Sequence, residues 1–199
     1  MTRAAEIAVN APDNELARLV VDDHDPRVRA LALALAVRRA PRAAAVAAWR
    51  HAAGDSDARV RLRAAQLAPK LGRAIPSASL LALLGDGDAW VAEAAAYAAG
   101  EKARPSRRLV SALVDAATSH DDALVREAAV AALGAHGDPA TLPAVLRACD
   151  DKPAIRRRAV LALAAFEGPE VEARLRAALE DRDWQTRQAA EDLLRTEAE

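Results

Sequence analysis

The sequence predicts an all-α fold, an α-α superhelix of about six helical hairpins, and three observations support this prediction. A β-branched residue recurs at steps of 30 to 34 residues, at Val28, Val60, Val91, Val125, Ile155 and Thr186. Ala stands four residues after it in every copy. In most copies an acidic residue precedes it by five positions and Arg follows it directly. A repeat of this length over nearly the whole chain is typical of helical solenoids, whose units bury their apolar faces only against their neighbours.

Each repeat is predicted to hold a helix A, a tight turn and a helix B that carries the recurring residues. The Asp three positions before the β-branched residue suits the N-cap of helix B, because its carboxylate can accept an unpaired backbone N–H. These residues are Asp25, Asp57, Asp88, Asp122 and Asp183, whereas repeat 5 has Lys152 there. The glycines that follow helix B suit left-handed C-terminal caps, and they are Gly72, Gly100, Gly134 and Gly168.

The expected helices follow in order from these signals. The predicted pairs are 13–21 and 26–39, 41–53 and 57–71, 76–84 and 88–100, 105–119 and 122–134, 139–149 and 153–167, and 169–180 and 183–196. Residues 1–12 have weaker patterning and are expected to be either a frayed segment or a cap on the first repeat. Because the breaks between repeats are short, we expect residues 1–199 to form a single array. Its repeats would lie at about 13–39, 41–71, 76–100, 105–134, 139–167 and 169–196.

The composition limits the possible classes of protein. Hydrophobic residues make up 52% of the chain but aromatic residues only 3%, and no segment reaches the roughly 18 apolar residues that a membrane span needs. The net charge of −1 gives no general attraction to nucleic acid or anionic lipid. Cys149 is the only cysteine, so there is no disulfide framework. Because the N-terminus also lacks the pattern of a secretory signal, these features predict a cytoplasmic protein.

The repeated phrase resembles a known family. The runs Asp-Asp-His-Asp-Pro-Arg-Val-Arg at 22–29 and Leu-Gly-Ala-His-Gly-Asp-Pro at 133–139 look like HEAT repeats, and they are most similar to the short HEAT-like repeats of phycobilisome lyases. The similarity covers about residues 13–196 and implies a HEAT-like solenoid. It also implies a hydrogen-bonded ladder, in which the Asp of each turn and the Arg after the β-branched residue stack along the array. The acidic positions would be Asp23, Asp55, Asp86, Asp150 and Asp181, and the basic ones Arg29, Arg61, Arg126, Arg156 and Arg187.

This implied ladder is interrupted at two consecutive positions. Ala92 replaces the Arg of repeat 3, and His120 replaces the Asp of repeat 4. The step of 34 residues between the β-branched positions of these two repeats is also the longest in the chain. We therefore expect a local change of superhelical twist between residues 101 and 121.

Residues that could carry catalysis are few. The histidines have no His-x-x-x-His or His-Glu spacing, which metal binding on a helix would need, and they are expected to be solvated or capping residues. Cys149 is expected to be a small core residue. Ser and Thr residues have no evident His partner, and no glycine-rich phosphate loop is present. We expect no metal, no cofactor and no enzymatic activity.

The variable surface of the B helices is the candidate binding site. The resemblance places these helices along the concave face of the array, with an exposed stripe that begins one residue before the β-branched position. The candidate residues are Arg59, Arg63 and Lys70 in repeat 2, Trp90, Glu93 and Tyr97 in repeat 3, and Arg157 in repeat 5. The same stripe includes Arg27, Arg38, Gln66 and Glu101.

The aromatic residues of the stripe allow two interpretations. Aromatic residues and Arg commonly anchor interfaces, which favours Trp90 and Tyr97 as binding residues. They could instead fill the core between Ala-rich helices, and the sequence leaves both interpretations open. Trp49 and Trp184 are expected to pack inside the protein.

The function that accounts for the whole sequence is a non-enzymatic scaffold or adaptor. We expect a monomer that binds a protein partner through its concave face and does not interact with membranes. Two alternatives remain open. One is nucleic-acid binding that resembles that of HEAT-like DNA glycosylases, which the near-neutral charge disfavours. The other, favoured only by the repeat subclass, is a chromophore lyase or chaperone similar to the phycobilin lyases.

Overall fold

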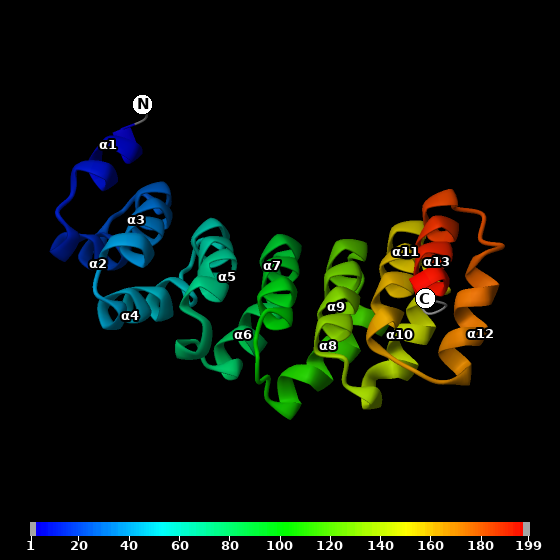
Figure 1. Cartoon of the computed structure of the whole chain (residues 1–199). Coiled ribbons are helices and arrows are strands. Elements are labelled where there is room, and N and C mark those ends of the chain that lie inside the picture. The colour runs from blue at the N-terminus through cyan, green and yellow to red at the C-terminus, as the bar shows by residue number, and fades with distance from the viewer. Residues whose placement is uncertain (1–2, 197–199) are drawn as a thin grey trace. The chain divides into compact units, whose positions relative to one another are not determined.

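The computed structural model describes residues 3–196, and these residues form helices and no strand (Figure 1). The predicted all-α class and the succession of helical hairpins are therefore confirmed. The chain divides into two compact units, Met1–Arg104 and Pro105–Glu199, which we call unit 1 and unit 2. The single continuous array stays a prediction.

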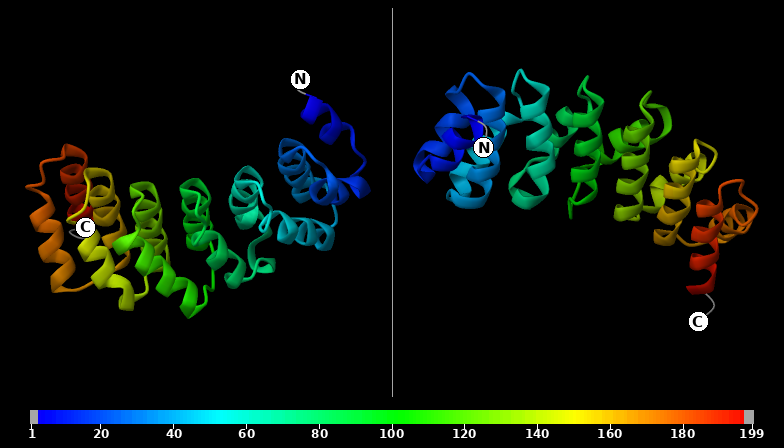
Figure 2. Two further views of the ribbon diagram at one scale, coloured as in Figure 1. Left: turned by 180° about the vertical axis from the view of Figure 1, so that it is seen from behind. Right: turned by 90° about the horizontal axis from the view of Figure 1, so that it is seen from above.

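Unit 1 contains three helical hairpins and one preceding helix. The hairpins are α2 (Asp13–Asp22) with α3 (Pro26–Arg39), α4 (Arg42–Ala52) with α5 (Ala58–Leu71), and α6 (Ser77–Leu84) with α7 (Ala89–Gly100); η1 (Gly72–Ala74) is a short 3-10 helix after α5. The B helices α3, α5 and α7 lie side by side, because α5 packs against both of the others (Figures 1 and 2). The first helix, α1 (Arg3–Asn10), packs against α3 and thus caps the first hairpin.

Unit 2 repeats this arrangement. Its hairpins are α8 (Arg107–Ser119) with α9 (Ala123–His136), α10 (Leu142–Ala148) with α11 (Pro153–Ala162), and α12 (Pro169–Ala178) with α13 (Trp184–Thr196). Two 3-10 helices, η2 (Pro139–Thr141) before α10 and η3 (Leu163–Ala165) after α11, take up parts of the segments predicted as continuous helices. Here α11 is the central B helix and packs against both α9 and α13.

The predicted N-caps of the B helices are confirmed. The side chains of Asp25, Asp57, Asp88 and Asp122 accept backbone N–H groups of the first helical turn, and Asp183 accepts that of Thr186. Lys152 makes no such side-chain bond. Each cap satisfies a donor that the helix itself leaves unpaired, which explains why helix B starts at nearly the predicted residue in the five repeats that have this Asp.

Three of the four glycine predictions are wrong. Gly72 is the C-cap of α5 and has a positive φ of 52°, but Gly100 and Gly134 lie within helices, and Gly168, with a φ of 120°, is the N-cap of α12. Helix α9 continues past Gly134 and ends at Gly137, whose φ is 58°. Gly134 serves a close approach between helices instead, because a Cβ at this position would lie 2.6 Å from the Cβ of Ala162 in α11.

The core of each unit is built from small and branched apolar side chains. The six recurring β-branched residues and the Ala four positions after each of them are at most 1% exposed. They form the buried seam on which the A helices pack. Trp49 is fully buried, as expected, and its indole N–H donates to the carbonyl of Ala64 at 2.6 Å. None of the helices in the described part of the chain is long and apolar enough to cross a membrane.

Candidate functional site

Four of the five predicted ladder Arg residues connect two neighbouring turns, whereas Arg187 donates to the Asp181 and Arg182 carbonyls of its own turn. The Nε and Nη2 atoms of Arg29 donate to the Asp55 carboxylate, both at 2.7 Å, while its Nη1 donates to the Asp23 carbonyl of its own turn at 2.9 Å. The same pair of hydrogen bonds between guanidinium and carboxylate joins Arg61 to Asp86, Arg126 to Asp151 and Arg156 to Asp181, at 2.6 to 3.0 Å. The planar guanidinium suits this role because it can face a carboxylate and carbonyls at once.

The Asp that pairs with a ladder Arg is the one that also accepts a backbone N–H within its own turn. Asp55 and Asp86 also accept the backbone N–H of the N-cap residue, at 2.8 and 2.9 Å. In repeat 5 the carboxylate that bonds this N–H is that of Asp151, at 2.7 Å, so Asp151 pairs with Arg126. The prediction of Asp150 was therefore wrong, and Asp150 pairs with Arg174 at 2.6 Å instead.

Ala92 and His120 replace both the expected Arg and the expected Asp, so neither of these two positions holds an unpaired guanidinium or carboxylate. Ala92 is fully buried. His120 keeps one function of the missing Asp, because its Nδ1 accepts the N–H of Asp122 at 3.0 Å. The expected change of twist between residues 101 and 121 stays a prediction.

The charges of the ladder are matched and stabilise the scaffold. The bonded guanidinium of Arg61 lowers the pKa of Asp86, and that of Arg156 lowers the pKa of Asp181. Both carboxylates thus remain ionised and bonded at neutral pH. The ladder residues stabilise neighbouring turns and are not candidates for acid–base catalysis.

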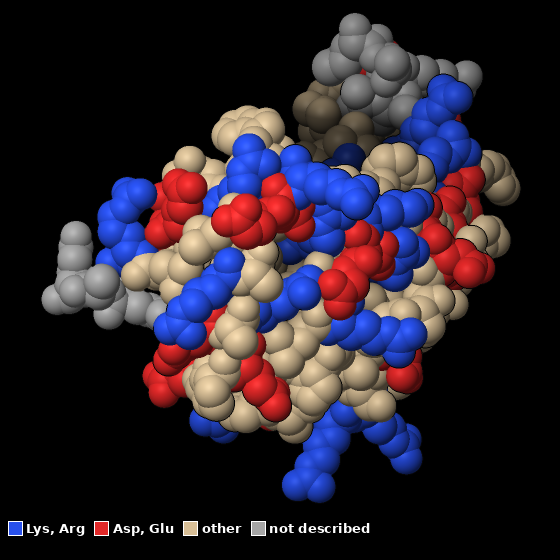
Figure 3. Space-filling view, turned by 90° about the vertical axis from the view of Figure 1, so that its right-hand side faces the viewer, with Lys and Arg blue, Asp and Glu red and all other residues tan. Residues whose placement is uncertain are grey.

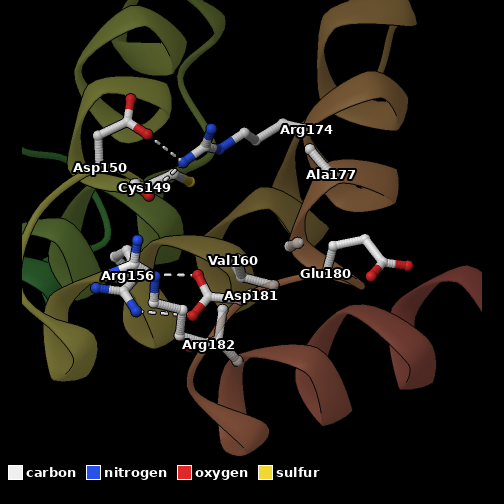
Figure 4. Close-up of a pocket in the computed structure, with 11 residues that line it drawn as sticks. Cys149, Asp150, Arg156, Val160, Arg174, Ala177, Glu180, Asp181 and Arg182 are labelled. Atoms are coloured by element: carbon white, nitrogen blue, oxygen red, sulfur yellow. Dashed lines mark hydrogen bonds and ion pairs between the residues drawn. The ribbon is translucent and has the colours of Figure 1, made fainter.

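A cavity of about 480 Å³ lies in unit 2 between α10 and α12 (Figure 4). Arg174 of α12 reaches across it to the Cys149 carbonyl and Asp150, and the pair Arg156–Asp181 forms another part of its wall. Cys149 is 2% exposed, as expected of a core residue, and burial raises the pKa of its thiol. The formal charges of the lining balance, because Arg156, Arg174 and Arg182 lie there with Asp150, Glu180 and Asp181.

Six of the seven predicted site residues lie together in unit 1. Arg59, Arg63 and Lys70 are exposed on α5, and Trp90, Glu93 and Tyr97 lie on the neighbouring α7. The side chains of Trp90 and Tyr97 are 62% and 60% exposed, so they do not fill the core. The sequence had left this open.

The polar groups of α5 differ in what they already bond. Arg59 pairs with Asp57 at 2.8 Å and lowers the pKa of that carboxyl to about 2. Arg63 donates to the neutral side chain of Gln66 at 3.2 Å. Neither Arg63 nor Lys70 forms an ion pair with another residue of the described part.

The seventh predicted residue, Arg157, lies on α11 in unit 2. It is half-buried and donates to Gln185 of α13, while Arg158 lies 3.5 Å from Glu127 of α9. Both side chains thus bridge neighbouring B helices. The structure does not bring Arg157 together with the other six within one unit.

Sequence reasoning placed one aromatic residue wrongly. Trp184 was expected to pack inside the protein, but it is 64% exposed as the first residue of α13. Of the five aromatic residues in the chain, three are therefore exposed, and all three lie on B helices.

On the face seen in Figure 3, Lys and Arg side chains are mixed with Asp and Glu side chains. Among residues 3–196, no group of three or more His, Cys, Asp or Glu residues could hold a metal ion.

Comparison with known proteins supports the architecture. Residues 77–157 match the model of the HEAT repeats, and residues 155–181 match that of the PBS lyase HEAT-like repeat. No curated protein sequence matches the chain.

Solved structures agree with this. The chain is similar to YibA of Escherichia coli, at 19% identity and a TM-score of 0.65 over 98% of this chain and 75% of that one. It is also similar to a designed armadillo repeat protein in complex with the peptide (KR)4, at 15% identity and a TM-score of 0.70 over 93% and 99% of the two chains. Human deoxyhypusine hydroxylase shares 19% identity and a TM-score of 0.52 over 94% and 74%. At these identities the likeness shows the fold alone. Together with the repeat period and the ladder, the matches show that the chain contains HEAT repeats, with a PBS lyase HEAT-like repeat at residues 155–181.

Proposed function

We propose that this protein is a non-enzymatic scaffold or adaptor that binds a segment of a protein partner through one surface of unit 1. We call this surface the B-helix face, and it comprises Arg59, Arg63, Gln66, Lys70, Trp90, Glu93 and Tyr97. The observation that carries the proposal is the exposure of Trp90 and Tyr97 beside the cations of α5.

Physical chemistry supports a binding role for these side chains. The free energy falls when a large aromatic side chain leaves water, so two such side chains exposed on one helix face favour contact with another molecule. Aromatic residues and Arg are also the residue types that most often dominate binding energy at protein interfaces. The charged residues of the turns, by contrast, already bond to one another.

The proposal is tested by displaying random peptides to the full-length protein. Peptides selected on the wild type are expected to bind the double variant Trp90→Ala/Arg63→Glu at least about tenfold more weakly, because both anchors are lost. The matched control is Trp184→Ala/Arg50→Glu, which removes an equally exposed Trp from α13 and reverses an exposed Arg on the A helix α4.

The controls decide between binding and unfolding. Thermal melts of both double variants should stay close to that of the wild type, because all four substituted side chains are exposed. Of the four, Arg63 alone has a described side-chain partner, the neutral Gln66. Selected peptides that bind the double variant on the B-helix face as tightly as the wild type would contradict the proposal. A nucleic-acid function would instead give tight binding of oligonucleotides at low salt that weakens steeply as salt is added.

A further inference from the structure

The positive charges near the B-helix face lie on α3 and α5. Arg27 and Arg38 are exposed on α3, at the same register positions as Arg59 and Lys70 on α5. No carboxylate of the described part lies within ion-pair distance of Arg27, Arg38, Arg63 or Lys70. Only Arg59 is neutralised, by Asp57. This part of the surface therefore attracts negative charge.

The apolar part of the face lies on α7. Trp90 and Tyr97 are seven residues apart, which places them two helical turns, or about 10 Å, apart on one side of the helix. Ala94 lies between them on the same side and is 6% exposed. The two rings thus flank a small, buried side chain.

We propose that the occupant of this face is an extended acidic segment of a partner protein. One apolar side chain of the segment lies between Trp90 and Tyr97, and its carboxylates face Arg63 on α5 and Arg27 on α3. This inference rests on the function proposed above and adds the chemistry of the partner.

The spacing of the helices sets the spacing of the motif. Packed helices lie about 8 to 10 Å apart, and an extended chain advances about 3.3 Å per residue. A segment that crosses α7, α5 and α3 therefore moves from one helix to the next in about three residues. The expected motif has one apolar residue and two acidic residues, each about three positions apart.

The charges of α7 favour a peptide over a nucleic acid. The stripe of α7 carries Glu93 and Glu101 beside its aromatic residues. Bases stacked on Trp90 and Tyr97 would bring phosphates close to these carboxylates, and like charges repel. A peptide can place an uncharged residue at this point and keep its carboxylates over α5 and α3.

Short synthetic peptides test the inference by fluorescence anisotropy on the full-length protein. The acidic probe has Leu at position 1, Glu at positions 4 and 7, and Gly or Ser elsewhere; a second probe has the reverse order. One comparison peptide has Lys in place of Glu, and another has both Glu residues next to Leu. Of the two acidic probes, the one that binds more tightly is expected to bind about tenfold more tightly than the Lys peptide. It should also bind more tightly than the peptide with altered spacing.

Charge reversal in the protein sharpens the test. Arg63→Glu is expected to weaken the acidic probe about tenfold and to strengthen the Lys peptide, whereas the control Arg50→Glu changes neither. Equal binding of the acidic and Lys peptides up to about 1 mM would overturn the inference, as would tighter binding of a single-stranded oligonucleotide at the same salt concentration.

The two proposals fail in different ways. If displayed peptides depend on Trp90 and Arg63 but are basic or neutral, the acidic partner is wrong and the binding face stands. If no selected peptide depends on these residues, the binding face itself is wrong.

Discussion

Replacement of Arg29 by Lys separates the charge of the ladder from its geometry. Arg29 donates four hydrogen bonds, two to the Asp55 carboxylate at 2.7 Å and two from Nη1 to the carbonyls of Asp23 and His24, at 2.9 and 3.3 Å. A Lys ammonium keeps the charge, but its single nitrogen cannot reach both the carboxylate and the carbonyls, so at least two bonds are lost. The side chains of Arg29 and Asp55 are only 12% and 5% exposed, so water replaces these bonds poorly. At about 1 kcal/mol for each lost bond, we expect a loss of about 2 kcal/mol in the free energy of unfolding.

Urea unfolding followed by circular dichroism measures this loss. The matched control is Arg27→Lys, on the same helix, because the side chain of Arg27 is exposed and bonds no carboxylate of the described part. Its effect should stay within about 0.5 kcal/mol. Equal unfolding midpoints for the two variants would refute the reasoning that bond geometry, rather than charge alone, gives the ladder its strength.

Three further predictions concern stability. Because Arg61 lowers the pKa of Asp86 in the folded protein, this carboxylate stabilises the fold above its unfolded pKa of about 4 and loses its effect as the pH falls through the folded value. The difference in unfolding free energy between wild type and Asp86→Asn should therefore shrink in acid. A constant difference from about pH 7 to about pH 2 would contradict this. Gly134→Ala should cost about 1 to 3 kcal/mol in thermal unfolding, because its Cβ would overlap an Ala of α11, whereas Gly87→Ala, with open space around it, should have little effect; equal melting temperatures would exclude the close approach. Trp49→Ala should cost about 3 to 5 kcal/mol and Trp90→Ala less than about 0.5, so a large loss for the second would mean that Trp90 belongs to the core.

The fold was predictable because each repeat carries the same local signals. The period of the β-branched residues and of the Ala one turn later defines the buried seam, and the N-cap Asp marks the start of helix B. The identity of each ladder carboxylate was less predictable. It depends on which side chain bonds the N-cap N–H, and the local turn around Lys152 shifts this role from Asp150 to Asp151.

The positions of the candidate residues along their helices were predictable, but the contacts between neighbouring helices were not. Trp90 and Tyr97 occupy stripe positions that the helical period places on the surface, and they are exposed. Trp184 lies outside that stripe, and its exposure follows from its place at the start of α13. The role of Gly134 could not be predicted, because it depends on how closely α11 approaches.

Several predictions remain to be tested because they concern properties beyond the described geometry. They are the continuous array, the change of twist after residue 101, the participation of Arg157, the monomeric state and the cytoplasmic location. The B-helix face does not depend on any of them, because its residues lie on α5 and α7 of unit 1.

Nuclear magnetic resonance of the Trp side chains tests the binding face most directly. The chain has three Trp residues, so its spectrum contains three indole N–H signals, each assigned by a Trp→Phe variant. Trp49 is buried and Trp184 is equally exposed on another helix, so both serve as internal controls. On titration with the acidic probe, the signal of Trp90 is predicted to shift while the other two stay in place. A shift of the Trp184 signal with Trp90 unchanged would contradict the account.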